Sequence, residues 1–134
     1  MIVVDTSAWI ELFRGRSHPV ATALEGLIER HADIAITEIV LMEALAGAPS
    51  VDAVTRIRAQ LVGLPILRLE GLADFEEAAL LYRTCRSAGH TLRNQVDCLI
   101  AVPAIHHGAS ILHNDRDFDT IARHSALKLE PVLR

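Results

Sequence analysis

Five acidic residues stand out in this sequence because each of them lies beside or within an apolar stretch. Asp5 ends a short β-branched run at the start of the chain, and Glu43 lies in a largely apolar segment. Asp97 is surrounded by Val, Cys, Leu and Ile, while Asp115 and Asp117 follow a third apolar run. No lysine is close to any of these five residues in sequence.

Carboxylates in such surroundings predict one of two situations. Each can have a separate structural role, as a helix cap, as a partner of a helix dipole or as a solvated side chain. Alternatively, they converge, in which case burial and mutual repulsion raise their pKa values and cost several kcal/mol unless a cation compensates. A site built from oxygen ligands alone favours Mg²⁺ or Mn²⁺ over Zn²⁺.

The elements that would position these acids are short apolar strands alternating with helices. We expect strands at residues 1–4, 33–36, 66–67, 110–113 and 127–129. We expect helices at residues 6–13, 19–30, 38–46, 51–62, 74–88, 95–105 and 117–124. This alternation predicts an α/β fold with a parallel sheet. Because ligands gather at the carboxyl ends of parallel strands, the sheet would bring all five acidic segments to one edge.

Five other residues carry structural expectations. Thr6 or Ser7 would cap the first helix. Trp9 and Phe13 would belong to the core rather than form a stacking platform for bases. Pro103 lies inside the expected helix 95–105, where it removes a backbone donor, so we expect a kink or an early end of that helix.

Length and composition exclude several classes of protein. The chain has 134 residues, of which 51% are hydrophobic and 22% charged, which predicts one folded domain over residues 1–134 and excludes disorder. The longest apolar stretch, residues 98–105, is far shorter than the roughly 20 residues that span a membrane. The first residues lack the basic region of a signal peptide. We therefore expect a cytoplasmic protein in which Cys85 and Cys98 are reduced and buried.

The charge of the chain limits how it could bind nucleic acid. Its formal net charge is −4, whereas proteins that hold nucleic acid by bulk electrostatics are usually basic. Phosphates would have to be met locally, by a few arginines or by metal ions. Arg83, Arg86 and Arg93 precede Asp97, and Arg116 lies between two of the acids, so we expect some of these arginines to contact phosphates.

Four segments of the sequence together resemble the PIN-domain ribonucleases, and among them the VapC toxins of type II toxin–antitoxin systems. The segments are VDTSAW (4–9), ITEIVLMEALAGA (36–48), NQVDCLIA (94–101) and HNDRDFD (113–119). The resemblance covers essentially the whole chain. It implies a three-layer α/β/α sandwich with a short parallel sheet, and cleavage of RNA phosphodiester bonds that depends on Mg²⁺, with Mn²⁺ as a substitute.

The resemblance also implies roles for individual residues. By position, the acidic quartet of the family that holds the metal and drives catalysis corresponds to Asp5, Glu43, Asp97 and Asp115. Asp117 corresponds to a fifth acid that is present in many members and would complete the metal site.

The substrate side of the site follows in the same way. Ser7 corresponds to a small hydroxyl residue near the metal, and we group it with Arg93 and Arg116 as substrate-binding residues. This chain departs from the family at His113, where Thr or Ser is usual, and at Pro103, where Ala or Leu is usual. The first departure concerns hydrogen bonding around the metal site rather than the metal ligands themselves.

The resemblance further implies partners. In the family, apolar surface near the first helices receives the cognate antitoxin, here of the VapB type, and the toxins commonly form homodimers. No membrane is implied.

Two other functions stay open from the sequence. The chain could be a PIN-like module that binds proteins without catalysis, although it retains every acid. It could also be an Asp-dependent phosphotransfer protein. However, a phosphatase of the haloacid type needs a second Asp at the position of Ser7, and a receiver needs a late Lys where only Lys128 exists.

Overall fold

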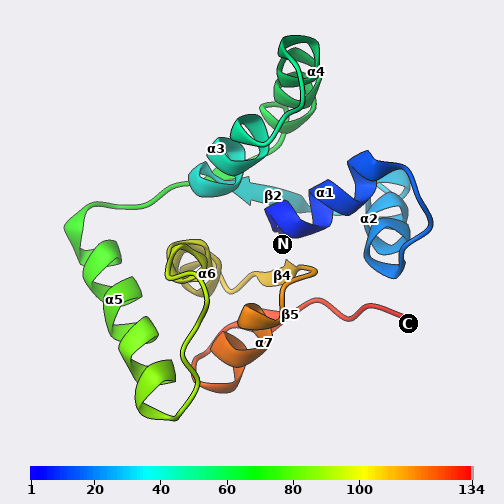
Figure 1. The fold of residues 1–134 in the computed structure, drawn as a ribbon. Coiled ribbons are helices and arrows are strands. Elements are labelled where there is room, and N and C mark those ends of the chain that lie inside the picture. Colours follow the sequence, from blue (N-terminus) through cyan, green and yellow to red (C-terminus); the bar gives the residue numbers. More distant parts are fainter. Residues whose placement is uncertain (134) are drawn as a thin grey trace.

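The computed structural model describes residues 1–133, and these residues form a five-stranded parallel sheet surrounded by helices (Figure 1). The strand order is β3-β2-β1-β4-β5. The strands are β1 (Ile2–Val4), β2 (Ile34–Thr37), β3 (Ile66–Leu67), β4 (Ser110–Leu112) and β5 (Lys128–Leu129). The helices are α1 (Thr6–Arg14), α2 (Pro19–Glu29), α3 (Glu38–Ala46), α4 (Val51–Leu61), α5 (Leu72–Ser87), α6 (Val96–His106) and α7 (Arg116–Arg123).

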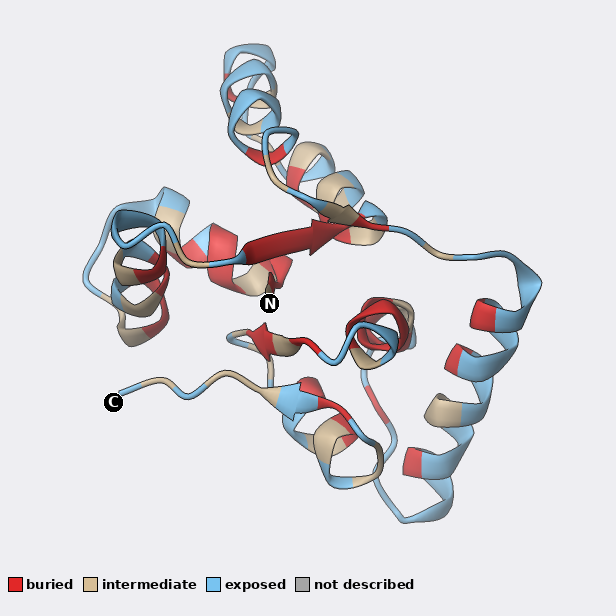
Figure 2. Ribbon diagram, turned by 180° about the vertical axis from the view of Figure 1, so that it is seen from behind, coloured by how far each residue is buried: buried red, intermediate tan, exposed pale blue. Residues whose placement is uncertain are grey.

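Helices cover both faces of this sheet. Successive residues of a strand point to opposite faces, so consecutive buried residues require cover on both sides. All four residues of β2 are buried, as are the last two residues of β1 and of β4 (Figure 2). The predicted α/β class and the three-layer α/β/α sandwich are therefore confirmed.

The sheet has a topological switch point between β1, its central strand, and the neighbouring strand β4. From β1 the chain crosses through α1 and α2 to β2 on one side, whereas β4 continues to β5 on the other side. Strands β1 and β4 pair in register from Ile2–Ser110 to Val4–Leu112, and the Asp5 N–H donates to the Leu112 carbonyl just beyond them. In open α/β sheets, ligands bind at such a point, outside the carboxyl ends of the strands. Asp5 lies there.

The helices that follow the strands begin at residues whose side chains cap them. Thr37 ends β2 and accepts a hydrogen bond from the Val40 N–H, which fixes the start of α3. Asp5, rather than Thr6 or Ser7, is the N-cap of α1, so that expectation is wrong. Thr6 already belongs to the helix, and a carboxylate directly after the strand reaches the free N–H of Ser7 first.

Three other structural expectations have different outcomes. Trp9 is buried, as expected, but Phe13 is 37% exposed and stacks on Trp9 at the surface, so placing Phe13 in the core is wrong. The helix around Pro103 does not end early: α6 continues to His106. Pro103 is buried, as are most residues of α6, so tertiary packing stabilises the helix despite the missing backbone donor.

Cys85 and Cys98 are both buried and form no disulfide, as expected. Burial raises the pKa of the Cys98 thiol to about 12, which leaves this thiol protonated and unreactive. Among residues 1–133, no helix combines the length and the apolar composition that crossing a bilayer requires.

Candidate metal centre

Three aspartates from two separate segments meet at the switch point of the sheet. Asp97 lies in the first turn of α6, Asp115 caps α7, and Asp117 lies in the first turn of α7. Each of the three offers a carboxylate oxygen, and these oxygens all lie within 4.8 Å of one another. The rest of α6 and strand β4 separate Asp97 from the other two aspartates in the sequence, so it is the fold that brings the three together.

Asp97 is the most perturbed member of the cluster. Its exposed fraction is 5%, and its Oδ2 atom is buried without a hydrogen-bond partner among the described residues. Burial, followed by the charges of Asp5 and Asp115, raises the pKa of Asp97 from 3.8 to about 8. A buried acceptor without a partner costs free energy, so this oxygen is suited to a ligand that protein atoms do not provide.

Asp5 and Glu43 lie beside this cluster without belonging to the tight triplet. Burial raises the pKa of Asp5, and the charge of Glu43 adds to that rise, so the two carboxylates are near each other. The Thr6 hydroxyl donates to Glu43 Oε1 over 2.8 Å, which links the start of α1 to the middle of α3. The structure thus brings all five predicted acids to one edge of the sheet.

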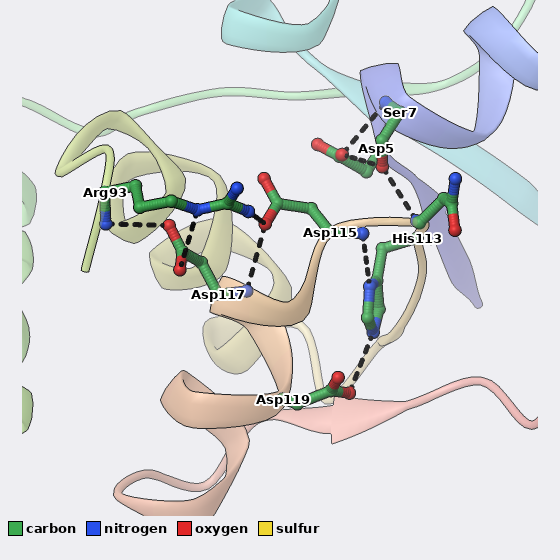
Figure 3. A network of polar contacts seen from close by, with 8 residues as sticks. Asp5, Ser7, Arg93, His113, Asp115, Asp117 and Asp119 are labelled. Carbon is green, nitrogen blue, oxygen red and sulfur yellow. Dashed lines mark hydrogen bonds and ion pairs between the residues drawn. The ribbon is translucent and has the colours of Figure 1, made fainter. Parts of the chain in front are cut away.

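Ser7 joins the two loops that carry Asp5 and Asp115. Its hydroxyl donates to Asp5 Oδ2 and accepts a hydrogen bond of 2.8 Å from the Asn114 N–H (Figure 3). Ser7 therefore holds the carboxyl ends of β1 and β4 together. In the structure Ser7 thus has a positioning role, and its contact with substrate stays a prediction.

Arg93 occupies the mouth of the acidic cluster. Its Nη2 atom donates to Asp115 Oδ1 over 2.9 Å, its Nε atom is 3.7 Å from Asp117 Oδ1, and its backbone N–H donates to Asp117 Oδ2 (Figure 3). The side chain is nevertheless 62% exposed. Arg93, for which we expect a phosphate contact, thus forms ion pairs with two of the acids and offsets their negative charge. Arg116 is exposed and lies next to them on α7.

His113 fills the position where the sequence departs from the family. Its Nδ1 atom accepts a hydrogen bond of 3.0 Å from the Asp115 N–H, so the proton of the neutral ring is on Nε2, 3.4 Å from Asp119 Oδ1. The ring also packs against Phe118. A hydroxyl at this position would accept from the same N–H, so the histidine keeps the turn that aims Asp115.

The capping and metal interpretations of the acids do not exclude each other. Asp115 Oδ1 accepts from the Asp117 N–H as the N-cap of α7, and Asp5 caps α1 in the same way. Each cap uses one carboxylate oxygen, and a carboxylate has a second one. Capping fixes the rotamer of the side chain, which helps to hold the other oxygen in place.

The residues present fit a hard divalent cation. All donors are oxygen atoms, one of them is buried without a partner, and a guanidinium already lies against the cluster as a positive charge. The absence of Cys and His from the triplet disfavours Zn²⁺.

Two residues contact the predicted site residues although neither of them was assigned a role at the site from the sequence. Thr6 holds Glu43, and Asp119 holds His113. The only signal for either of them was its place beside a predicted ligand, since contacts between side chains of separate elements have no local pattern.

Comparison with known proteins shows the family of this chain. The family model described as PIN domain matches residues 2–124. Ribonuclease VapC11 of Mycobacterium tuberculosis and the VapC ribonuclease Mb1587 of Mycobacterium bovis are each 46% identical to the chain over 124 residues, which cover 92% of this chain and 92% of the relative.

Solved structures share the fold. VapBC2 of Rickettsia felis, solved with a promoter DNA fragment, aligns with a TM-score of 0.74 at 24% identity, covering 97% of this chain and 98% of that one. A toxin–antitoxin complex from Klebsiella pneumoniae aligns with a TM-score of 0.65 at 25% identity, covering 83% of each chain. With a family match over most of its length and relatives of nearly equal size, the chain belongs to the PIN-domain family and, within it, to the VapC ribonucleases.

Proposed function

We propose that this protein is the toxin of a type II toxin–antitoxin system and acts as an endoribonuclease that hydrolyses phosphodiester bonds in RNA. The observation that carries this proposal is the convergence of Asp97, Asp115 and Asp117, with a buried oxygen of Asp97 left without a partner. The relatives named ribonucleases, at 46% identity over nearly the full chain, supply the reaction class.

Asp97, Asp115 and Asp117 would hold Mg²⁺, or Mn²⁺ in its place, with Asp5 and Glu43 completing the negative charge around it. A bound ion of this kind lowers the pKa of a water ligand and offsets charge that develops on a phosphate. Asp5, Glu43, Asp97 and Asp115 are thus the proposed catalytic residues, and Asp117 is a further metal ligand.

The remaining residues of the site position these groups and meet the substrate. Ser7 holds the two loops together, and His113 orients the turn of Asp115. Arg93 compensates Asp115 and Asp117 while its exposed side chain can turn from these carboxylates to an RNA phosphate. Arg116 is exposed beside them. In an acidic protein, these two arginines would provide the local positive charge that RNA requires.

The proposed setting of this activity is the cytoplasm, with residues 1–134 acting as a single domain. The proposed partners are a VapB-type antitoxin, RNA and a second copy of the chain. Solved relatives are toxin–antitoxin complexes, which supports the antitoxin. The side chains of Trp9 and Phe13 border an apolar cavity of about 230 Å³ that also reaches Glu43, so a partner seated there would lie next to the acids.

A cleavage assay tests the proposed function. Purified protein with Mg²⁺ or Mn²⁺ is expected to cut cellular RNA, whereas Asp97→Asn and Asp5→Asn are expected to abolish cleavage because each removes a charge from the site. Asp52→Asn, on the exposed start of α4, is the matched control and should cut like the wild type. Full activity of Asp97→Asn would contradict the proposal, and so would a wild type that folds but cuts no RNA.

A further inference from the structure

A groove leads away from the acidic cluster along α7. Its main part has a volume of about 880 Å³. The charged side chains that line it are Arg93, Arg116 and Arg123 together with Asp117 and Asp119. A second cavity of about 300 Å³ shares Arg93, Arg116 and Asp119 with it and extends to Asn114 and Asp115. The two together connect the acids to the far end of α7.

Two of the arginines that line this groove belong to α7. Arg116 is the first residue of α7 and Arg123 the last, so they are seven residues apart. Seven residues are two helical turns, which place both side chains on one face about 10 Å apart along the axis. Two positive charges on one side of a groove can contact separate phosphates of one extended strand.

The charges of these arginines are not used within the described part of the protein. Among residues 1–133, no acidic side chain lies within ion-pair distance of Arg116 or Arg123, and Arg123 makes one hydrogen bond, to the Thr120 hydroxyl. By contrast, Arg93 is engaged by Asp115 and Asp117, and Asp119 faces His113. Asp117 and Asp119 also line the groove, but they pair with Arg93 and His113, so Arg116 and Arg123 are the arginines of α7 that stay available to a ligand.

We propose that this groove holds an RNA strand on one side of the bond to be cut, with Arg123 as a phosphate contact about two helical turns beyond the acids. This inference rests on the proposed function, since the acids define where cleavage occurs. It gives the site a direction: RNA runs from the acidic cluster past Arg116 to Arg123. A substrate too short to reach Arg123 would be bound more weakly, while chemistry at the acids would be unaffected.

An RNA-binding measurement tests the groove. A fluorescently labelled single-stranded RNA is titrated with protein in EDTA, so that binding is read without cleavage. We expect Arg123→Ala to weaken binding about five- to tenfold and to lower the slope of affinity against salt by about one phosphate contact. Arg58→Ala, which removes an exposed arginine from α4, should bind like the wild type.

Kinetics with Mg²⁺ separate binding from chemistry. Arg123→Ala should raise KM for the RNA by a similar factor and leave kcat unchanged, and Arg123→Lys should restore most of the affinity because a point charge still meets the phosphate. If Arg123→Ala and Arg58→Ala bind RNA equally well, the groove proposal is overturned even if RNA is cut. If the wild type binds RNA through Arg123 but never cuts it, the groove stands and the proposed function fails.

Discussion

At the scale of single residues, the charge of Asp97 affects both the stability of the fold and the proposed binding of a metal ion. Its carboxyl group is buried next to Asp5 and Asp115, which raises its pKa to about 8. Without a cation, the folded protein therefore favours the protonated form, whereas the unfolded chain releases this proton near pH 4. The same group that would bind a metal destabilises the metal-free fold once it is charged.

The pH dependence of stability should reveal this. Between the unfolded and the folded pKa of Asp97, the folded protein binds one proton more than the unfolded chain, so raising the pH through this range favours unfolding. In EDTA, the free energy of unfolding of the wild type should fall from about pH 4 to about pH 8. Asp97→Asn should be as stable as the wild type or more stable, and its stability should change less over this range. Chemical denaturation at several pH values measures both, and a wild type that gains stability as the pH rises would contradict the expectation.

His113 is a second residue with a testable role. Its ring accepts from the Asp115 N–H two residues on, which is the bond an asparagine side chain makes in a turn. His113→Ala should weaken Mn²⁺ binding about ten- to a hundredfold, the usual loss when a group that orients a metal ligand is removed. His113→Asn should keep most of the affinity. Equal Mn²⁺ affinity of the alanine variant and the wild type, measured by calorimetry, would show that the turn needs no such acceptor.

The sequence identified the acids but not how they are held. Asp97 and Asp115 were recognisable because a charge beside apolar residues or directly after a strand is unusual, and because parallel strands end at one edge. The ion pairs of Arg93 and the bond from Thr6 to Glu43 join segments more than 20 residues apart. Contacts of that kind depend on the three-dimensional arrangement, which no local pattern encodes.

At the scale of the elements, periodicity and capping residues predicted nearly every strand and helix to within a few residues. The expected strand 33–36 is observed as Ile34–Thr37, and the expected helix 74–88 as Leu72–Ser87. The clearest departure concerns Pro103, at which the local rule predicts an early end of the helix. Tertiary packing outweighs that rule, because α6 is buried along much of its length and continues to His106. Local propensity is a weak guide where an element lies in the core.

The start of α3 is an element whose integrity should affect the site. Thr37 is almost fully buried and caps the helix that carries Glu43. Thr37→Ala removes the acceptor of the buried Val40 N–H, and should lower the free energy of unfolding by about 2 kcal/mol. Thr37→Ser keeps the hydroxyl and should lose less than half as much. Thermal or urea unfolding compares the two variants, and equal stability of both would show that the cap is not the cause.

At the scale of the whole molecule, the distribution of charge reconciles an acidic chain with a nucleic acid substrate. The net charge is −4, yet the groove along α7 carries arginines without acidic partners among residues 1–133. Arg116 and Arg123 thus offer unpaired positive charge where the proposed RNA lies, although the chain as a whole is acidic. This arrangement agrees with local phosphate recognition rather than bulk electrostatic attraction.

Expression in cells tests the proposed biological role. Production of the wild type alone should arrest growth, because uncontrolled cleavage of RNA halts protein synthesis. Co-expression of the neighbouring small open reading frame should restore growth, and Asp97→Asn should be harmless at the same protein level. Normal growth with the wild type alone would contradict the role as a toxin, although it would leave the nuclease activity standing.

The central claim is that acids from distant parts of the chain jointly bind a divalent cation. Calorimetric titration with Mn²⁺ tests it most directly, with the wild type, Asp97→Asn and the control Asp52→Asn compared in the same buffer. The account predicts saturable Mn²⁺ binding by the wild type and the control, and its loss in Asp97→Asn. If Asp97→Asn binds Mn²⁺ as tightly as the wild type, or if the wild type binds none, the account is contradicted.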